Sequence, residues 1–242
     1  MILKEWSKLP AEMQTDEVRL YYDALHRKKY SLIFKRLFDV IVSAVMLIVL
    51  SPVFLSLAVA IKFDSRGPVF FRQFRVTQYG KQFRIFKFRT MVQDADSGSN
   101  VTIHNDSRIT RVGGFIRKNR LDETSQLLDV FRGTMTFVGT RPEVPKYVSR
   151  YTPEMMATFL LPAGITSETS LFYKDESRLL EDAEDLDRTY VEVILPGKMF
   201  YNLRSIENFS FWHDLKIMLM TVPVMFGKKY TAPELPYSVQ KH

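Results

Sequence analysis

Cysteine is absent from this sequence, which excludes disulfide bonds, thiolate nucleophiles and cysteine-ligated metal sites. The four histidines, His26, His104, His213 and His242, are scattered along the chain and do not indicate a metal cluster. A secretory signal is also lacking, because residues 1–30 are too polar for its apolar segment. We expect this stretch to be an amphipathic or loosely ordered extension.

What the sequence does contain is apolar and basic. Its hydrophobic fraction of 46% and aromatic fraction of 13% are ample for a folded core. The net charge of +7 and the isoelectric point near 9.5 indicate an anionic partner. Nucleic acid, an acidic membrane surface and a phosphorylated substrate all meet that description, and charge alone does not choose among them.

One long apolar run, Val40 to Ile61, carries no charged residue. A helix needs roughly 20 apolar residues to span a bilayer, so this run is long enough. It is apolar on every helical face, which argues against a core helix of a soluble domain. We therefore predict a membrane segment here.

The pair Ser51-Pro52 interrupts the run near its centre, where proline removes a backbone donor and kinks or breaks a helix. The Ser51 hydroxyl is available to bond the carbonyl that Pro52 leaves unpaired. Basic residues flank the run on both sides, and basic flanks tend to stay in the cytoplasm. A re-entrant hairpin that returns to the cytoplasmic face satisfies both flanks; a single crossing does not.

After this segment the sequence predicts a mixed helical and β domain. Strand-like stretches over residues 69–76 and 82–90, joined through Tyr79-Gly80, indicate a β-hairpin rich in basic residues. A helix is expected to begin near Thr110, and Asn119 to cap a further helix that ends at Gly133. Residues 94–106 read as a loop, 134–139 as a short strand and 153–160 as a helix. The apolar stretch 209–226 is expected to pack into the core or lie at the membrane interface.

The stretch RKNRLDE, which ends in Asp122 and Glu123, gathers charges of both signs. On these residues alone a helix cap is the simpler interpretation, because acidic residues favour a helix start. The membrane segment and further cations at Lys87, Arg89, Arg111 and Arg141 change the balance. A carboxylate among guanidinium groups is expected to stay ionised, with its pKa held down, and an ionised carboxylate can attack phosphorus. Glu123 is then available to hold Mg²⁺ together with substrate phosphates.

At this point the sequence resembles a known family. From about Phe34 to Val222 it is similar to the bacterial sugar transferases, the monotopic polyprenyl-phosphate phosphoglycosyl transferases. The matching elements, in the family's order, are KRLFDVIVSAVMLIVLSPVF, IKFDSRGPVFFRQFR, GKQFRIFKFRTM, ITRVGGFIRKNRLDETSQLLDVFRG, VGTRP, PAGIT and FWHDLKIMLMTV.

The resemblance implies that Asp122 attacks the β-phosphate of a UDP-sugar, releases UMP and passes the sugar phosphate to undecaprenyl phosphate. It implies Glu123 as the Mg²⁺ partner and Lys87, Arg117 and Arg141 as phosphate-binding residues. The helix break at Ser51 and Pro52 and an active site on the cytoplasmic face of the bacterial inner membrane also follow from it. The product would begin a capsule, exopolysaccharide, O-antigen or glycoprotein glycan.

Four threonines depart from the family pattern: Thr77 and Thr140 stand at usual glycine and proline positions, Thr134 at a usual aspartate and Thr136 at a usual serine. None of them removes the carboxylate pair. Thr134 puts in doubt any role that the aspartate plays elsewhere in the family.

The expected fold is α+β, with a polar extension (1–33), a re-entrant membrane helix (34–62), a catalytic domain with a β-hairpin and interfacial helices (63–226) and a tail (227–242). The expected partners are the UDP-sugar, undecaprenyl phosphate and membrane lipids, and no nucleic acid. A homo-oligomer is left open. The alternatives are a non-catalytic membrane-anchored binder of anionic lipid or nucleic acid, and a glycosyltransferase that releases UDP.

Overall fold

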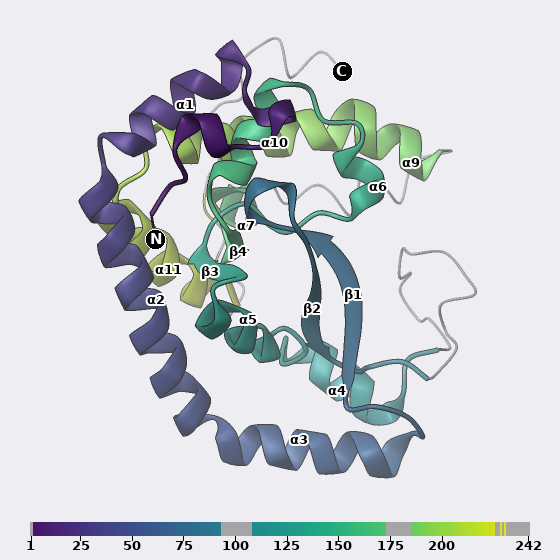
Figure 1. The fold of residues 1–242 in the computed structure, drawn as a ribbon. Coiled ribbons are helices and arrows are strands. Elements are labelled where there is room, and N and C mark those ends of the chain that lie inside the picture. Colours follow the sequence, from purple (N-terminus) through teal and green to yellow (C-terminus); the bar gives the residue numbers. More distant parts are fainter. Residues whose placement is uncertain (1, 93–107, 173–184, 226–227, 229, 231–242) are drawn as a thin grey trace.

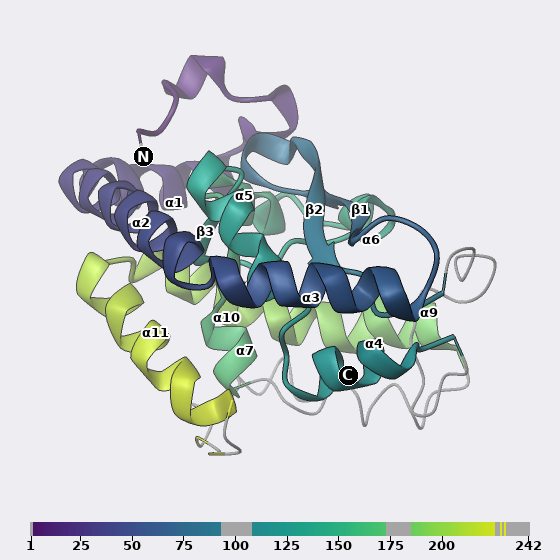
Figure 2. The same cartoon turned by 90° about the horizontal axis from the view of Figure 1, so that it is seen from below.

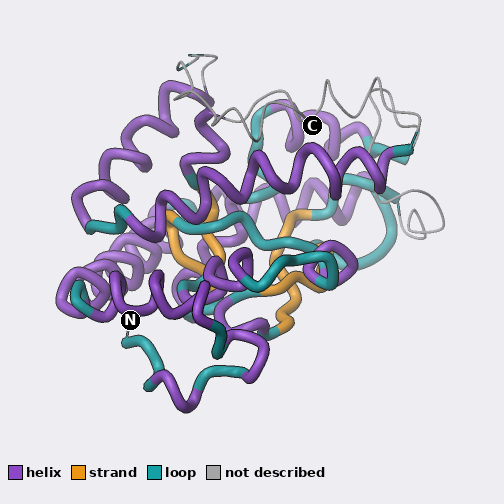
Figure 3. Tube along the Cα trace, turned by 90° about the horizontal axis from the view of Figure 1, so that it is seen from above, coloured by secondary structure: helices purple, strands orange, loops and turns teal. Residues whose placement is uncertain are grey.

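The computed structural model describes residues 2–92, 108–172, 185–225, 228 and 230. Helices and short strands are mixed along the described chain, which confirms the α+β class (Figures 1 and 3). The predicted loop over 94–106 and nearly all of the tail lie outside the described residues. The helices are α1 (Asp16–His26), α2 (Lys29–Val49), α3 (Ser51–Asp64), α4 (Arg111–Lys118), α5 (Leu127–Arg132), α6 (Pro145–Val148), α7 (Glu168–Phe172), α9 (Leu186–Thr189), α10 (Leu195–Glu207) and α11 (Phe211–Met225). The strands are β1 (Phe70–Val76), β2 (Gln82–Phe88), β3 (Met135–Val138) and β4 (Ala163–Thr166).

Helices α2 and α3 form a bent pair that runs down one side of the molecule and along its underside (Figures 1 and 2). Their axes differ by 60°. The Ser51 hydroxyl donates to the Ile48 carbonyl over 2.7 Å, the bond that Pro52 cannot make, as the sequence predicts. Within the described chain no single helix has the length and apolarity to cross a bilayer, but this bent pair does.

One face of α2 is polar and buried against the rest of the chain. Lys35, Asp39 and Ser43 recur at helical spacing and are each at most 2% exposed. Lys35 donates to the Asp214 carboxylate over 2.5 Å and to the Val138 carbonyl over 2.8 Å. Asp39 accepts from the Thr136 hydroxyl over 2.7 Å. These bonds fasten α2 to α11 and β3, while its outer face stays apolar and exposed.

The β-hairpin forms as predicted, with Phe70 opposite Phe88 and Val76 opposite Gln82. Its turn needs left-handed backbone at Tyr79 (φ 59°) and Gly80 (φ 69°). Glycine adopts such angles freely and tyrosine rarely does. Burial of the Tyr79 ring and the hydrogen bond that its hydroxyl accepts from the Lys4 N–H stabilise the turn.

The second sheet pairs β3 with β4 in parallel, with Met135 opposite Ala163 and Val138 opposite Thr166. The expected strand over 134–139 is therefore confirmed, whereas β4 is not apparent in the sequence. Gly139, just beyond β3, packs directly against Gly164 inside β4. The Gly139 N–H donates to the Thr166 carbonyl over 3.0 Å, and the Gly164 N–H donates to the Thr140 carbonyl over 2.8 Å.

The contact between Gly139 and Gly164 has no room for a side chain. A Cβ added at Gly164 would lie 2.2 Å from the Gly139 nitrogen. We expect Gly164→Ala to lower the free energy of unfolding by about 3 kcal/mol, the upper part of the range for overpacking. Gly114→Ala, in the middle of α4 with nothing within 4 Å, is the matched control. It should raise that free energy by about 0.5–1 kcal/mol. Thermal midpoints in one detergent test this pair; equal midpoints would contradict it.

The first residues of the chain contribute to the core. Met13, Val18 and Leu25 are fully buried and cluster with Leu160 and Phe209. Helix α1 is amphipathic, as expected, but it is a packed element and not a loose extension. The boundary that we expect between residues 33 and 34 falls inside α2.

The structure makes two further expectations more specific. The helix predicted over 153–160 is a 3-10 helix, Glu154–Leu160, that ends before Pro162. The stretch 209–226 forms α11, whose Ile217 is buried while Trp212, Leu219 and Val222 are exposed. The helix therefore packs on one side and presents an apolar surface on the other.

Candidate active site

Asp122 follows a tight helix end. The backbone N–H of Leu121 donates to the Ile116 carbonyl over 2.9 Å, and that of Arg120 donates to the Arg117 carbonyl over 3.0 Å. Arg120 has a left-handed backbone (φ 53°). These two bonds and that angle are the Schellman motif that ends many helices, normally with glycine at the left-handed position. The motif turns the chain sharply just before Asp122.

The prediction that Asn119 begins a helix is therefore wrong. Asn119 is the C-cap of α4, and its side-chain amide donates to the Phe115 carbonyl. A short 3-10 helix, Thr124–Gln126, separates it from α5. The sequence conceals this helix end because an arginine stands where glycine usually signals it. The helix start at Thr110 and the end at Gly133 are confirmed.

The backbone of Asp122 is fixed by its neighbours. Its carbonyl accepts from the Phe88 N–H over 3.0 Å, which ties the end of β2 to the turn. The Thr124 hydroxyl donates to the Leu121 carbonyl over 2.6 Å. Because β2 and this turn are joined at Phe88, Lys87 is brought beside the carboxylates.

Glu123 lies between two cations. Its Oε1 accepts from Lys87 Nζ over 2.9 Å and from Arg141 Nη2 over 2.5 Å, and Oε2 lies 3.4 Å from Arg141 Nη1. Lys87 comes from β2 and Arg141 from the loop after β3. Burial raises the pKa of the Glu123 carboxyl, but Arg141 and Lys87 outweigh it and hold that pKa at about 2. Glu123 is therefore ionised across the physiological range.

The sequence predicts a lowered pKa for the Asp122 carboxyl, and this prediction is wrong: the pKa is raised. Burial raises the pKa of its carboxyl, and so does the negative charge of Glu123; Lys87 and Arg117 only partly oppose them. Two of the cations expected to depress the pKa of Asp122, Lys87 and Arg141, are instead paired with Glu123. Among the described residues, none forms an ion pair with Asp122, so its carboxylate stays available.

The structure thus unites four of the predicted site residues: Lys87, Asp122, Glu123 and Arg141. Arg117 acts on Asp122 through its charge rather than through a hydrogen bond. Ser51 and Pro52 lie at the bend between α2 and α3 and belong to the helix pair. The described part of the chain holds no group of three or more His, Asp or Glu side chains placed to bind a metal ion.

Arg75 and Glu143 lie near the site and are not singled out by the sequence. Arg75 lines a small cavity of about 20 Å³ together with Lys87 and Arg141. Its guanidinium lies 3.8 Å from the Glu143 carboxylate, and Glu143 accepts a hydrogen bond from the Tyr190 hydroxyl. In the sequence Arg75 is one of several basic residues of the predicted hairpin. Its place next to buried Val76, at the end of β1, is the signal that separates it from the exposed arginines.

Two of the threonine departures, Thr77 and Thr134, contact each other. The Thr77 hydroxyl donates to the Thr134 carbonyl over 2.7 Å and accepts from the Ala163 N–H over 3.1 Å. The Thr134 hydroxyl donates to the Asp129 carbonyl over 3.0 Å. These side chains join the hairpin turn, β3 and β4. In this chain Thr134 is a structural link between α5 and β3.

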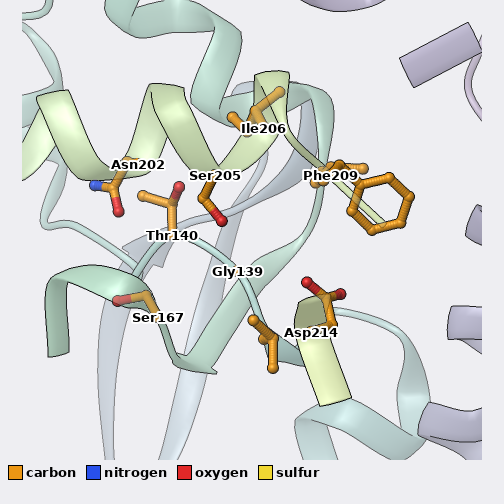
Figure 4. A pocket seen from close by; sticks show the side chains of 10 residues that line it. Gly139, Thr140, Ser167, Asn202, Ser205, Ile206, Phe209 and Asp214 are labelled. Atoms are coloured by element: carbon orange, nitrogen blue, oxygen red, sulfur yellow. The ribbon is translucent and has the colours of Figure 1, made fainter. Parts of the chain in front are cut away.

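Another departure, Thr140, lines a cavity that contains neither Asp122 nor Glu123. This cavity of about 20 Å³ is also lined by Ser167, Asn202, Ser205 and Asp214, together with apolar side chains (Figure 4). That volume suits about one water molecule. The next residue, Arg141, turns to Glu123. Thr140 and Arg141, consecutive residues of the VGTRP element, therefore lie in two different environments.

Comparison with known proteins agrees with this geometry. The family model described as bacterial sugar transferase matches residues 30–228. The chain is 36% identical over 197 residues to a UDP-glucose:undecaprenyl-phosphate glucose-1-phosphate transferase of Klebsiella pneumoniae, covering 79% of this chain and 40% of the relative. It is 34% identical over 192 residues to a UDP-N-acetylgalactosamine-undecaprenyl-phosphate N-acetylgalactosaminephosphotransferase of Aeromonas hydrophila, covering 78% of this chain and 42% of the relative.

A third relative is closer in length. The uncharacterized sugar transferase EpsL of Bacillus subtilis is 33% identical over 191 residues, covering 79% of this chain and 86% of the relative. The Klebsiella and Aeromonas relatives are longer, and the matched region spans about two-fifths of each. The family match covers most of the chain, including Lys87, Asp122, Glu123 and Arg141. The chain belongs to the bacterial sugar transferase family.

Proposed function

We propose that this chain transfers a sugar-1-phosphate from a UDP-sugar to undecaprenyl phosphate, with Asp122 as a covalent nucleophile and UMP as the first product. One observation carries the proposal. Two adjacent carboxylates have separate environments: Glu123 is neutralised by Lys87 and Arg141, while Asp122 is partly buried and has no ion-pair partner in the described chain. A partly buried carboxylate without a counter-ion is less well solvated and therefore more nucleophilic.

The reaction has two displacements at one phosphorus. An Asp122 oxygen bonds to the β-phosphorus of the UDP-sugar while the bond from that phosphorus to the bridging oxygen breaks, and UMP leaves with the electron pair. A phosphate oxygen of the polyprenyl phosphate then attacks the same phosphorus. The bond to Asp122 breaks, the carboxylate is restored, and the sugar is left on a lipid diphosphate.

The cations serve charge neutralisation, on which phosphoryl transfer chiefly depends. Lys87 and Arg141 hold Glu123 in place and face the position of the donor phosphates. Arg117 favours the ionised form of Asp122, because its charge lowers the pKa of that carboxyl. Arg75, Lys87 and Arg141 line one small cavity. Three cations are therefore gathered next to the carboxylate pair, Asp122 and Glu123.

Mg²⁺ fits this site as an ion shared with substrate, not as one caged by protein. Mg²⁺ is commonly bound through one or two carboxylates and the oxygens of substrate phosphates. Oε2 of Glu123, whose one contact is 3.4 Å long, is the oxygen open to it. When bound, the ion would neutralise charge on the donor diphosphate and its leaving group.

We propose that α2 and α3 enter the membrane from the cytoplasmic side and return to it. Their outer faces support this, since they expose Phe34, Leu37, Ile41, Ile48, Val49, Leu55, Val59 and Phe63. Such a continuous apolar surface marks a membrane or protein contact. A site beside the membrane brings the lipid acceptor and the nucleotide donor together.

The nucleotide product tests the proposal. Purified protein is incubated with Mg²⁺, a short-chain polyprenyl phosphate and a panel of UDP-sugars, and the nucleotides are separated by chromatography. We expect UMP and a lipid-linked sugar diphosphate with at least one sugar. UDP as the main product would identify a glycosyltransferase that cleaves the sugar–phosphate bond. No nucleotide release with any sugar would favour a non-catalytic membrane binder.

The pH dependence of UMP release tests the separate environments of Asp122 and Glu123. Asp122 must be ionised to attack, so release should fall as the pH drops through its raised pKa. Glu123→Gln removes the negative neighbour and should move this acid limb to lower pH, even though total activity falls. Glu5→Gln, at an exposed carboxylate on the N-terminal segment, should leave the limb in place. An unchanged limb in Glu123→Gln would contradict the electrostatic coupling.

A further inference from the structure

Arg89 directly follows β2 and is buried although it is charged. Its side chain is only 6% exposed. Nη2 donates to the carbonyl of Ser65 over 2.7 Å and to the hydroxyl of the same residue over 2.8 Å. Ser65 is the first residue beyond α3. One nitrogen of the guanidinium is therefore fixed to the end of the membrane helix pair.

The other two nitrogens have no partner. Nε and Nη1 of Arg89 are both covered from solvent, and neither makes a hydrogen bond within the described residues. Arginine stays protonated and carries five N–H donors. Buried charges are normally paired, because burial without a partner is costly. The arrangement is therefore incomplete as it stands, and an anion is the group that completes it.

The position of Arg89 limits which anion this is. Lys87 binds Glu123, and the Phe88 N–H donates to the Asp122 carbonyl, so the strand end that carries Arg89 also borders the nucleophile. On its other side Arg89 is joined to Ser65. The flanking cluster is apolar and contains Leu57 and Ile61 of α3, Phe88 and Ile116. Arg89 thus lies between the predicted nucleophile and the end of the predicted membrane segment.

We propose that Arg89 binds the phosphate of the lipid acceptor, a polyprenyl monophosphate. This inference rests on the proposed function and assigns the two substrates to different cations. The donor phosphates meet Lys87 and Arg141 beside Glu123, and the acceptor phosphate approaches along α3 and meets Arg89. A ligand reaches the covered nitrogens only by displacing the atoms over them, so binding includes a local rearrangement. Shielding from water strengthens a charge-assisted hydrogen bond at such a place.

The two half-reactions separate the substrates. UDP-sugar alone should give one burst of UMP and a sugar-phosphate adduct visible by intact mass; adding a water-soluble short-chain polyprenyl phosphate should then discharge the adduct. We expect Arg89→Gln to keep the burst within about twofold and to raise the acceptor concentration for half-maximal discharge roughly tenfold or more, the loss of a charged hydrogen bond. Arg89→Lys, which keeps the charge, should fall between Arg89→Gln and the wild type.

Arg84→Gln is the matched control, because Arg84 is an exposed arginine of the same strand. It should alter neither half-reaction. The assignment would be overturned if Arg89→Gln and wild type depend equally on acceptor concentration. It would also be overturned if Arg89→Gln loses both the UMP burst and the discharge of the adduct, because that result would indicate a purely structural role. If the wild-type protein itself releases no UMP, the proposed function fails, and this inference fails with it. A normal wild-type burst with an unaffected variant refutes the inference alone.

Discussion

Replacing Asp122 with asparagine is expected to reduce turnover by at least roughly 10⁴-fold, and by up to the order of 10⁶-fold seen when a serine protease loses its nucleophile. The amide has nearly the shape of the carboxyl group but cannot form the acyl phosphate. The sugar-phosphate adduct should be absent by intact mass, and the burst of UMP should be lost. The measurement is UMP release from a matched amount of protein in the same detergent or bilayer preparation.

Folding must be preserved for that result to concern chemistry. The Asp122 backbone is held through its carbonyl by the Phe88 N–H, a contact that asparagine retains. The thermal midpoint of Asp122→Asn should therefore stay within a few degrees of wild type. Asp23→Asn, at an exposed carboxylate of α1 paired with Arg19, is the same chemical change away from the site and should keep full activity. Wild-type turnover in Asp122→Asn would refute the nucleophile.

The largest effect on stability is expected at Lys35. Its ammonium is buried between the Asp214 carboxylate and the Val138 carbonyl. Lys35→Met should lower the free energy of unfolding by about 3–5 kcal/mol, because it leaves the Asp214 charge buried and unpaired. Thermal unfolding at one fixed scan rate measures the loss, which should amount to roughly 10 °C for a chain of this size.

A pH series identifies the cause of that loss. Burial raises the pKa of Asp214 and Lys35 opposes it, so removing Lys35 should raise that pKa further. A group with a raised pKa in the folded state favours folding at low pH and opposes it as the pH rises. The Lys35→Met variant should therefore lose stability with rising pH. Adding Asp214→Leu should recover most of the loss.

An exposed ion pair provides the comparison. Lys8 pairs with Glu5 over 2.8 Å, with both side chains mostly exposed. Lys8→Met should cost less than about 1 kcal/mol. A similar midpoint for Lys8→Met and Lys35→Met would contradict the claim that burial makes the Lys35 pair important.

Local signals in the sequence predicted local structure well. Proline and the neighbouring serine located the bend between α2 and α3, because the missing N–H and the rescuing hydroxyl act within one turn. Gly133 marked the end of α5 for a similar reason, since its left-handed backbone favours glycine. At Arg120 the same backbone geometry occurs without glycine, and there the prediction was wrong.

Properties that depend on distant residues were harder to predict. The parallel pairing of β3 with β4 joins segments on either side of α6 and the 3-10 helix, and no short pattern encodes it. The resemblance implies Lys87 and Arg141 as phosphate-binding residues, but neither it nor the spacing predicts that both side chains pair with Glu123. The charges close to Asp122 in sequence predict a lowered pKa for its carboxyl. Burial and the negative charge of Glu123 raise that pKa instead, and neither effect can be judged from sequence spacing.

The sequence also does not reveal the polar seam on α2, the buried face formed by Lys35, Asp39 and Ser43. Lys35 is one of the basic residues that flank the long apolar run, and the sequence does not single out Asp39, which directly precedes the run; both are buried in contacts with β3 and α11. A charged residue at helical spacing next to an apolar stretch either lies in solvent or is buried in a contact with the rest of the protein. Only the packing of α11 and β3 against α2 distinguishes them here.

That seam has a consequence for how the protein sits in a lipid bilayer. Along α2 the fastening is made by buried hydrogen bonds, and α3 is held through Leu57 and Ile61. A free helix responds to a thicker or thinner hydrocarbon layer by tilting. In the membrane placement that we propose, this bent pair is clamped along its inner side, so the protein would set its immersion depth. The lipids would then adapt by thinning or thickening locally around a rigid wedge.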